Sequence, residues 1–308
     1  MRALLIVNPT ATTTTARTRD VLVHALQSDL KMEVATTTHR DHALQLAAQA
    51  RADGLDLVIA LGGDGTVNEA VNGLLAEGPG EDVPMFAVVP GGSTNVFARA
   101  MGVPNDAIEA AGLVLEALRE RRHRSIGLGK ADSRWFTFCA GPGLDAEVIG
   151  AVEDHRADGR TSTPSLYVRS AVTQFYRGTD RDRPALTLSR PGHPDEQGIH
   201  LAIIQNTRPW TYIGDHPVDP CPLASFDTGL DMMALRGLGT LSTLRHVRQM
   251  LFGRGRPPHG RTVISLHDES EVTLWAARPT ALQIDGDHLG ERMSVRCRSV
   301  PGALRVLV

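Results

Sequence analysis

Two glycine-rich turns early in the sequence have the residue types of a phosphate-binding site. The first, Gly62-Gly63-Asp64-Gly65-Thr66, follows the apolar run Leu57–Leu61, which is typical of a buried strand. The second, Pro90-Gly91-Gly92-Ser93-Thr94-Asn95, follows another apolar run in the same way. Glycines let a phosphate come close to the backbone, and a helix that begins after each turn offers free N–H groups to an anion.

Acidic and polar side chains accompany these turns. Asp64 could hold a metal ion or a water molecule beside the phosphates. Thr66 and Glu69 have the spacing of a capping box, so we expect Thr66 to be the N-cap of the next helix. A structural strand–helix turn would explain this cap but not three glycines around an aspartate. The segment Asn8-Pro9-Thr10-Ala11-Thr12 could bind phosphate or only cap the following helix, and both readings stay open.

The elements that must position these turns alternate between strand and helix. Apolar runs predict strands at Ala3–Val7, Met32–Thr36, Leu55–Leu61 and Met85–Val89. Composition and spacing predict helices at Ala16–Ser28, Ala43–Arg51, Thr66–Ala76 and Pro104–Glu120, with Pro104 in the first turn of the last one. Such alternation implies a parallel sheet with helices on both faces, and ligands bind such sheets at the carboxyl ends of their strands.

The pattern changes after the basic cluster Arg121–Arg124. Short β-like runs separated by turn residues then dominate, which predicts a mostly antiparallel β domain. Helices are expected near Pro164–Tyr176 and Ser242–Phe252. We therefore expect an α/β domain over residues 1–124 and a β-rich domain over residues 125–308, whose last strand or tail could pack back on the first domain.

Composition excludes several classes of protein. A net charge of −3 does not suggest a general nucleic-acid binder, and 42% hydrophobic with 22% charged residues is a globular composition. The three cysteines are widely separated, so we expect neither a disulfide framework nor a zinc knuckle. No apolar run approaches the ~20 residues of a membrane helix, so we expect a cytoplasmic protein with a peripheral membrane role. Neither a P-loop motif nor a dinucleotide-binding motif occurs.

The two turns, together with Asn68-Glu69 and Ala98-Arg99, resemble the catalytic domain of diacylglycerol kinases. The sequence is similar in particular to the soluble bacterial lipid kinases, which are related to sphingosine and ceramide kinases. The resemblance covers Arg2–Arg124 and continues more loosely through Ala224–Asp231 and Ile284–Asp287. It implies an ATP- and Mg²⁺-dependent kinase that phosphorylates the hydroxyl of diacylglycerol or a similar lipid, with its active site in the interdomain cleft.

The resemblance also implies roles for individual residues. Asp64 would organise the catalytic Mg²⁺, and Asp287 would be the general base on the lipid hydroxyl. Asp145 and Asp285 would complete an acidic cluster, although from the residues alone Asp285-Gly286 is a signal for a hairpin turn. The residues expected to hold the nucleotide are Asn8, Pro9, Thr10, Thr12, Thr37, Gly62, Gly63, Asp64, Gly65, Thr66, Asn68, Glu69, Gly92, Ser93, Thr94 and Asn95.

Four departures from the family pattern affect this expectation. Thr10-Ala11-Thr12 stands where the first loop of the family usually carries a glycine after Asn-Pro. Val96 stands where some members have an aspartate, and Asp287 stands where the base is usually glutamate. The resemblance implies a structural Mg²⁺ site formed by Ser225, Asp227 and Leu230, but Thr228 replaces its expected ligand.

A basic amphipathic segment follows in the β domain. The apolar residues Leu241, Leu244, Val247, Met250 and Leu251 share one helical face, and Arg245, Arg248, Arg254, Arg256 and Arg261 lie beside or beyond it. The segment could dock on an anionic membrane surface or pack on the β domain, and both interpretations stay open.

Other functions also stay open. The acceptor could be another lipid, such as a sphingoid base or ceramide, or a soluble molecule as in NAD kinases, and the protein could be a catalytically inactive nucleotide- or lipid-binding protein. The expected partner is a lipid at the inner face of the membrane, without nucleic acid. An edge of the β domain could pair two subunits in a homodimer.

Overall fold

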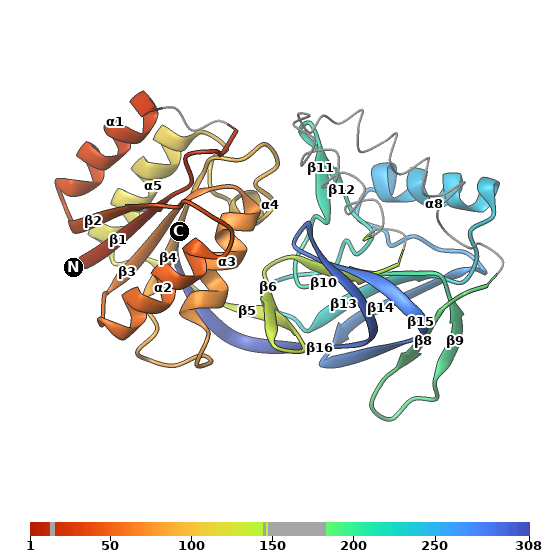
Figure 1. Cartoon of the computed structure of the whole chain (residues 1–308). Helices are drawn as coiled ribbons and strands as arrows, with labels where there is room; N and C mark the ends of the chain where they lie inside the picture. The colour runs from red at the N-terminus through yellow and green to blue at the C-terminus, as the bar shows by residue number, and fades with distance from the viewer. Residues whose placement is uncertain (13–15, 144–145, 147–182) are drawn as a thin grey trace. The chain divides into compact units, whose positions relative to one another are not determined.

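The computed structural model describes residues 1–12, 16–143, 146 and 183–308. The expected helix Pro164–Tyr176 and the candidate residue Asp145 lie outside the described residues. The chain divides into two compact units, which Figure 1 shows. Unit 1 comprises Met1–Leu128 with Pro301–Val308, and unit 2 comprises Gly129–Val300.

Unit 1 contains a parallel sheet whose strands follow the order β4-β3-β1-β2. The end of β16 also pairs with β4 in parallel, through Val306 and Phe86. The strands of this sheet are β1 (Arg2–Val7), β2 (Lys31–Thr36), β3 (Leu57–Gly62) and β4 (Met85–Pro90). The helices are α1 (Ala16–Gln27), α2 (His42–Ala52), α3 (Asp64–Leu74), α4 (Val96–Ala100) and α5 (Ala107–Glu120).

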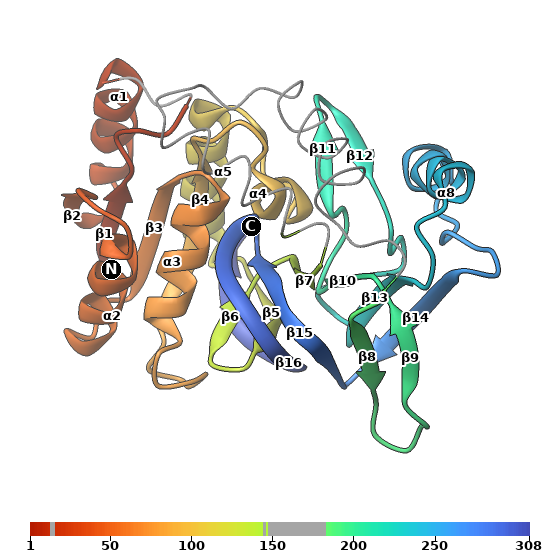
Figure 2. The same cartoon turned by 45° about the vertical axis from the view of Figure 1, so that its right-hand side comes forward.

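Helices cover both faces of this sheet because its central strands are apolar on both sides. Every residue of β3 is buried, as are five of the six residues of β1. Figures 1 and 2 show α1 and α5 on one face and α2 and α3 on the other. A strand buried on both faces has a continuous run of apolar residues, and such runs predicted these strands from the sequence.

Two predicted helix starts in unit 1 are wrong. The helix α3 begins at Asp64, with Gly63 as its N-cap, so Thr66 lies inside the first turn instead of capping it. The helix α5 begins at Ala107 because the Asp106 carboxylate accepts hydrogen bonds from the backbone N–H groups of Ile108 (2.9 Å) and Glu109 (3.0 Å). An aspartate cap satisfies these N–H groups, so Pro104 precedes the helix.

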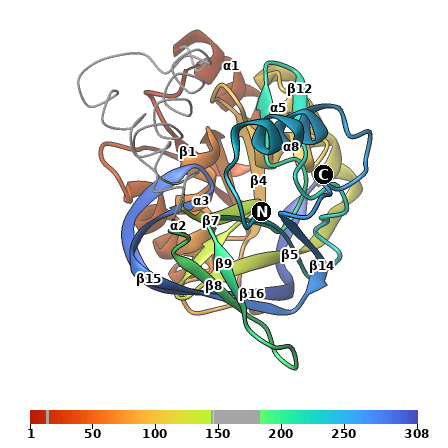
Figure 3. The same cartoon turned by 90° about the vertical axis from the view of Figure 1, so that its right-hand side faces the viewer.

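Unit 2 is built mainly from antiparallel strands in the order β14-β13-β10-β7-β15-β16, with β8 on β15 and β9 on β8. Its core is a cluster of apolar residues that includes Phe136, Ile204, Met232 and Leu274. The strands that lie wholly or partly in this unit are β5 (His123–Ala131), β6 (Arg134–Phe136), β7 (Cys139–Pro142), β8 (Leu186–Ser189), β9 (Glu196–Ile199), β10 (Leu201–Gln205), β11 (Thr211–Ile213), β12 (His216–Val218), β13 (Leu230–Leu235), β14 (Val263–Glu269), β15 (Glu271–Ile284) and β16 (Asp287–Leu307). The helix α8 (Thr240–Phe252) lies on this unit, and Figure 3 shows it from the side of unit 2.

The predicted fold class is confirmed: an α/β region with parallel strands precedes a mostly antiparallel β region. The three cysteines are free and buried. Among the described residues, no helix has the length and apolar character needed to cross a bilayer.

Candidate active site

The carboxyl ends of the parallel strands lie together in unit 1. Val7, the last residue of β1, is opposite Leu61 of β3 and Thr36 of β2, and Gly62 is opposite Pro90 of β4. The residues that follow these strands are therefore neighbours at one edge of the sheet. The sheet thus brings together the four predicted segments that begin at Asn8, Thr37, Gly63 and Gly91.

The two glycine loops touch each other through their backbones. A Cβ atom on Gly92 would lie 2.7 Å from the Cα of Gly63, and a Cβ on Gly63 would lie 3.3 Å from the Cα of Gly92. The backbone N–H of Gly91 donates to the carbonyl of Gly62 (2.9 Å). A side chain on Gly92 would force the loops apart, so the glycine is required here by close approach of the two chains.

Side-chain amides hold the loops in shape. Asn95 has a left-handed backbone (φ 50°), and its side chain both accepts from the Gly92 N–H (2.9 Å) and donates to the Gly92 carbonyl (2.8 Å). It also donates to Asn105 (2.8 Å), a residue that sequence reasoning missed and that no motif marks. Asn8 donates to the Thr66 hydroxyl (3.0 Å) and so links the first strand end to the first glycine loop.

Asp64 connects the two loops directly. Its carboxylate accepts hydrogen bonds from the backbone N–H groups of Val96 (3.0 Å) and Phe97 (3.1 Å), at the start of α4 after the second loop. The residue is half-exposed. Carboxylate oxygens are the ligands that Mg²⁺ prefers in proteins, so a partly exposed carboxylate at this edge of the sheet fits the predicted magnesium role.

Glu69 does not complete a capping box. Its carboxylate accepts from the backbone N–H groups of Asp41 (2.9 Å) and Ala43 (3.1 Å), so it caps α2 instead of its own helix. Asn68 is fully buried, and both its backbone carbonyl (2.8 Å) and its side-chain carbonyl (3.2 Å) accept from the side-chain amide of Asn72. Both side chains thus contact protein, and their contacts with a nucleotide stay predictions.

Several of the predicted nucleotide ligands face solvent at this edge of the sheet. Thr10, Thr12 and Ser93 are exposed. Partly exposed residues of the predicted set are Asn8, Thr37, Gly63, Asp64, Gly65, Gly92 and Thr94. Hydroxyl and backbone N–H groups thus surround the N-terminus of α3, whose partial positive charge favours phosphate.

In unit 2, Asp285 links its own turn to residues 137–139 by hydrogen bonds. It is 3% exposed, and its carboxylate accepts four hydrogen bonds. The donors are the N–H (2.7 Å) and hydroxyl (2.9 Å) of Thr137 and the N–H groups of Phe138 (3.0 Å) and Cys139 (3.0 Å). Four bonds use the acceptor positions of a carboxylate, so the geometry makes Asp285 a positioning residue and leaves no room for a proton-transfer role.

Asp287 begins the strand that leaves the same turn. Ile284 pairs with Asp287, and the two residues between them, Asp285 and Gly286, have φ values of 48° and 84°. Positive φ at both positions is the pattern of a two-residue type I′ hairpin, as the Asp-Gly pair predicted. Asp287 is half-exposed, unlike Asp285. The meeting of this turn with the Asp64 loop in one cleft stays a prediction.

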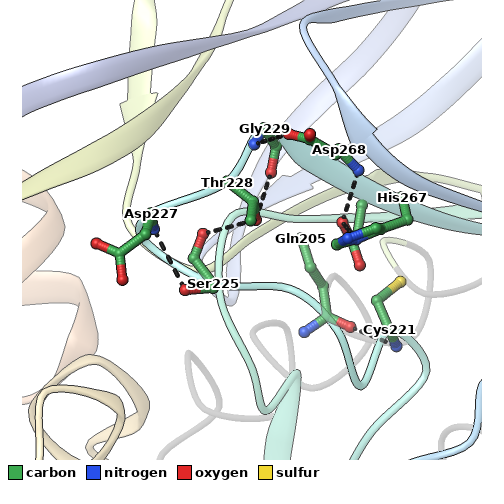
Figure 4. A network of polar contacts seen from close by, with 9 residues as sticks. Gln205, Cys221, Ser225, Asp227, Thr228, Gly229, His267 and Asp268 are labelled. Atoms are coloured by element: carbon green, nitrogen blue, oxygen red, sulfur yellow. Dashed lines mark hydrogen bonds and ion pairs between the residues drawn. The ribbon is translucent and has the colours of Figure 1, made fainter.

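The segment predicted to hold a structural Mg²⁺ forms a tight turn before β13 (Figure 4). The Ser225 carbonyl already accepts from the N–H (3.2 Å) and hydroxyl (3.1 Å) of Thr228. Leu230 is a core residue, and the Asp227 carboxylate is exposed and points away from the other labelled side chains. Among the described residues, no group of three or more His, Cys, Asp or Glu could hold a metal. The structural Mg²⁺ site of this segment stays a prediction.

A carboxylate–histidine pair lies beside this turn and was missed by sequence reasoning. The buried Asp231 accepts hydrogen bonds from His267 Nδ1 (2.8 Å) and from the Asp268 N–H (3.1 Å). Asp268 in turn accepts from the Gly229 N–H (2.6 Å). Burial raises the pKa of Asp231, and these hydrogen bonds oppose the rise. The pair joins β13 to β14, and the Asp268–Gly229 hydrogen bond joins β14 to the turn.

Comparison with known proteins agrees with the site in unit 1. Residues 2–131 match the family model described as the diacylglycerol kinase catalytic domain. A diacylglycerol kinase of Bacillus subtilis is 37% identical over 150 residues, which are 48% of this chain and 47% of the relative. A diacylglycerol kinase of Staphylococcus saprophyticus is 33% identical over 149 residues, with the same two shares. The chain spans about half the length of the curated relatives it matches.

The fold resembles a solved structure over nearly the whole chain. A Bacillus anthracis protein assigned as a diacylglycerol kinase aligns with a TM-score of 0.77, covering 99% of this chain and 96% of its own. The sequence identity is 20%, so this similarity shows the fold alone. The resemblance suggested by the two glycine motifs is therefore confirmed, and residues 2–131 of this chain match the diacylglycerol kinase catalytic domain.

Proposed function

We propose that this protein is a phosphotransferase that transfers the γ-phosphoryl group of ATP to the hydroxyl of diacylglycerol or a similar lipid. The observation that carries the proposal is the direct contact of two glycine loops at the carboxyl edge of a parallel sheet, within the segment that matches the kinase domain. Such an arrangement presents N–H groups and a helix N-terminus to phosphates, which is what phosphoryl transfer requires of a protein.

Individual residues have separable tasks in this proposal. Backbone N–H groups at Gly63–Thr66 and the hydroxyls of Ser93 and Thr94 would hold the phosphates. Asp64 would hold hydrated Mg²⁺, which would neutralise charge on the phosphates. Asp287 would accept the proton of the lipid hydroxyl as its oxygen attacks the γ-phosphorus, with ADP as the leaving group and phosphatidic acid or an analogue as the product.

The location follows from the substrates. ATP is available in the cytoplasm, and a lipid hydroxyl lies at the membrane surface. We therefore propose a cytoplasmic protein that works at the inner face of the membrane.

The test is a transfer assay with radiolabelled ATP and Mg²⁺ against separate acceptors. Dioleoylglycerol, sphingosine, ceramide and NAD should be offered in parallel, and label should appear in phosphatidic acid. Label in a sphingoid or ceramide product would assign another lipid, and label only in NADP would contradict the lipid proposal. Binding of ATP–Mg²⁺ without label in any product of a total lipid extract would favour an inactive binding protein.

The variant Asp287→Asn tests the assignment of the base in the same assay. It should lower transfer about 100-fold or more, because general-base catalysis contributes about 10²–10⁴-fold. The folded state should be little affected, since the amide has the shape of the carboxylate. The variant Asp287→Glu, which restores the residue usual in this family, should retain much of the activity. Transfer by Asp287→Asn near that of the unchanged protein would refute the role.

A further inference from the structure

The outer face of α8 combines exposed apolar residues with arginines. Leu241 is 85% exposed, Leu244 is 60% exposed and Phe252 is 66% exposed. At 100° per residue these three positions fall on one arc of the helix, and Arg245 and Arg248 lie on the same arc and are also exposed. We call this set of five residues the α8 outer face.

The opposite side of α8 is fixed to unit 2. His246 is the buried residue of the helix, and its Nε2 lies 3.1 Å from the hydroxyl of Thr262. Met250 packs against the small core cluster that includes Leu235, and its carbonyl accepts from the Asp219 N–H (3.0 Å). The side of α8 that carries His246 and Met250 therefore anchors the helix to unit 2, and its larger apolar side chains point outward. This arrangement differs from the apolar face that the sequence predicted, since Met250 lies on the other side.

The arrangement reverses the usual orientation of a surface helix. An amphipathic helix of a globular protein normally packs its apolar stripe on the core and exposes its polar side. Single exposed apolar residues are common, but three large ones on a single arc of one helix mark an interaction surface.

The charge of the surrounding segment indicates the partner. Residues 240–261 contain five arginines and no aspartate or glutamate, although the whole chain has a net charge of −3. Arg254, Arg256 and Arg261 are exposed like the two arginines of the helix. Apolar side chains beside clustered arginines match an anionic lipid surface, which attracts the charges and accepts the apolar groups.

A second copy of the chain fits less well. A symmetric dimer through the α8 outer face would place the arginines of one copy next to the same arginines of the other. We therefore propose that the α8 outer face, with the arginines up to Arg261, is the surface through which the protein docks on anionic membranes. This inference rests on the proposed lipid-directed function and names the surface that would bring the protein to its substrate.

Sedimentation with lipid vesicles tests the proposal independently of catalysis. The unchanged protein should sediment with phosphatidylcholine vesicles that contain phosphatidylglycerol at low salt, and much less with phosphatidylcholine alone. The double variant R245E/R248E should bind the anionic vesicles at least about 25-fold more weakly, because each basic residue contributes about fivefold. The double variant L241Q/L244Q should bind about tenfold more weakly at both low and high salt, since the lost contribution is apolar.

Matched controls separate the surface from general effects of charge and polarity. The variant R292E/R298E makes the same charge change at two exposed positions of β16, and W275Q/M293Q replaces two other exposed apolar residues. Both controls should bind vesicles as the unchanged protein does. Circular dichroism should report the same helix content in all variants.

Three results would overturn the proposal. In the first, both α8 variants bind vesicles as the unchanged protein does. In the second, the unchanged protein does not bind anionic vesicles at low salt. In the third, sedimentation velocity shows a dimer that the change L241Q/L244Q dissociates. Transfer to dioctanoylglycerol in non-ionic detergent should be the same for the two α8 variants as for the unchanged protein, because α8 carries none of the residues of the proposed chemistry. If no protein transfers phosphate there while the vesicle results come out as expected, the proposed kinase function fails and the docking surface stands.

Discussion

Asp64 and Asp285 carry the same functional group into different surroundings, one in each unit. Both carboxylates accept backbone N–H groups from a distant loop: Asp64 from the start of α4, and Asp285 from residues 137–139. Asp285 is buried and accepts four hydrogen bonds, whereas Asp64 is half-exposed with two of these contacts. A carboxylate in a motif can thus position the chain, bind a cation or do both, and its exposure to solvent helps to distinguish these roles.

The largest expected effect is the loss of stability in Asp285→Ala. The change leaves three buried N–H groups without an acceptor and places alanine in a left-handed conformation, which together cost about 3–5 kcal/mol. Urea unfolding followed by circular dichroism measures this loss. Asp285→Asn keeps one acceptor oxygen and tolerates the left-handed backbone, so it should lose about half as much. An Asp285→Ala protein as stable as the original would break the comparison with Asp64.

Asp64 should show the opposite balance between activity and stability. Asp64→Ala should lower transfer about 100-fold or more if the carboxylate holds Mg²⁺ in the proposed reaction. Its stability should fall by only about 1 kcal/mol, the usual value of a helix cap. Asp64→Asn retains an acceptor for the N–H groups of α4 but holds a cation poorly. Recovery of full transfer in Asp64→Asn would mean that the residue only positions the second loop.

Gly92→Ala tests the loop contact without changing a charge. The added Cβ would lie 2.7 Å from the Cα of Gly63, so the backbones must separate, at a cost of about 1–3 kcal/mol. ATP affinity, measured by calorimetry, should fall with stability because both loops face the phosphates in the proposed site. Gly112→Ala is a suitable control, since a Cβ at that position in α5 meets no atom within 4 Å. Equal ATP affinity in Gly92→Ala and Gly112→Ala would argue against a shared phosphate site.

The smallest expected effect concerns a third carboxylate, Asp231. Its pKa is raised above the ordinary value of 3.8 because it is buried, so its ionisation disfavours the folded state. The stability of the unchanged protein relative to Asp231→Asn should therefore fall as the pH rises from about 4 through the range in which Asp231 ionises. The difference in the free energy of unfolding between the two proteins, measured in urea, should change by less than about 1 kcal/mol between about pH 4 and pH 6. A stability difference that is constant or grows with pH would contradict this assignment.

The strands and the phosphate loops could be predicted from sequence because their causes are local. A run such as Leu57–Leu61 is buried on both sides wherever it lies in a sheet, and the Asp-Gly pair at 285–286 makes a hairpin by its own backbone preference. The side chains that fix the site have causes far away in the sequence. Glu69 caps a helix 26 residues earlier, and Asp285 contacts a segment 146 residues before it.

The orientation of α8 could not be predicted for the same reason. The sequence showed that the helix is amphipathic and left open whether its apolar face is buried or exposed. His246 decides the orientation through a contact with Thr262, which no periodicity reveals. The predicted start of α3 was also wrong. Thr66 and Glu69 have the spacing of a capping box, but Thr66 accepts from Asn8 and Glu69 caps α2.

The final eight residues have a consequence for dissecting this protein. Val306 pairs with Phe86 of β4, Leu304 and Leu307 are buried, and Arg305 donates to the carbonyl of Val83 (2.6 Å). Residues 301–308 thus form part of unit 1, while the segment that matches the family model ends at residue 131. The stretch that matches the family model is therefore not an autonomous folding module. A gene fragment that encodes it alone would produce a sheet with one uncovered edge, prone to self-association.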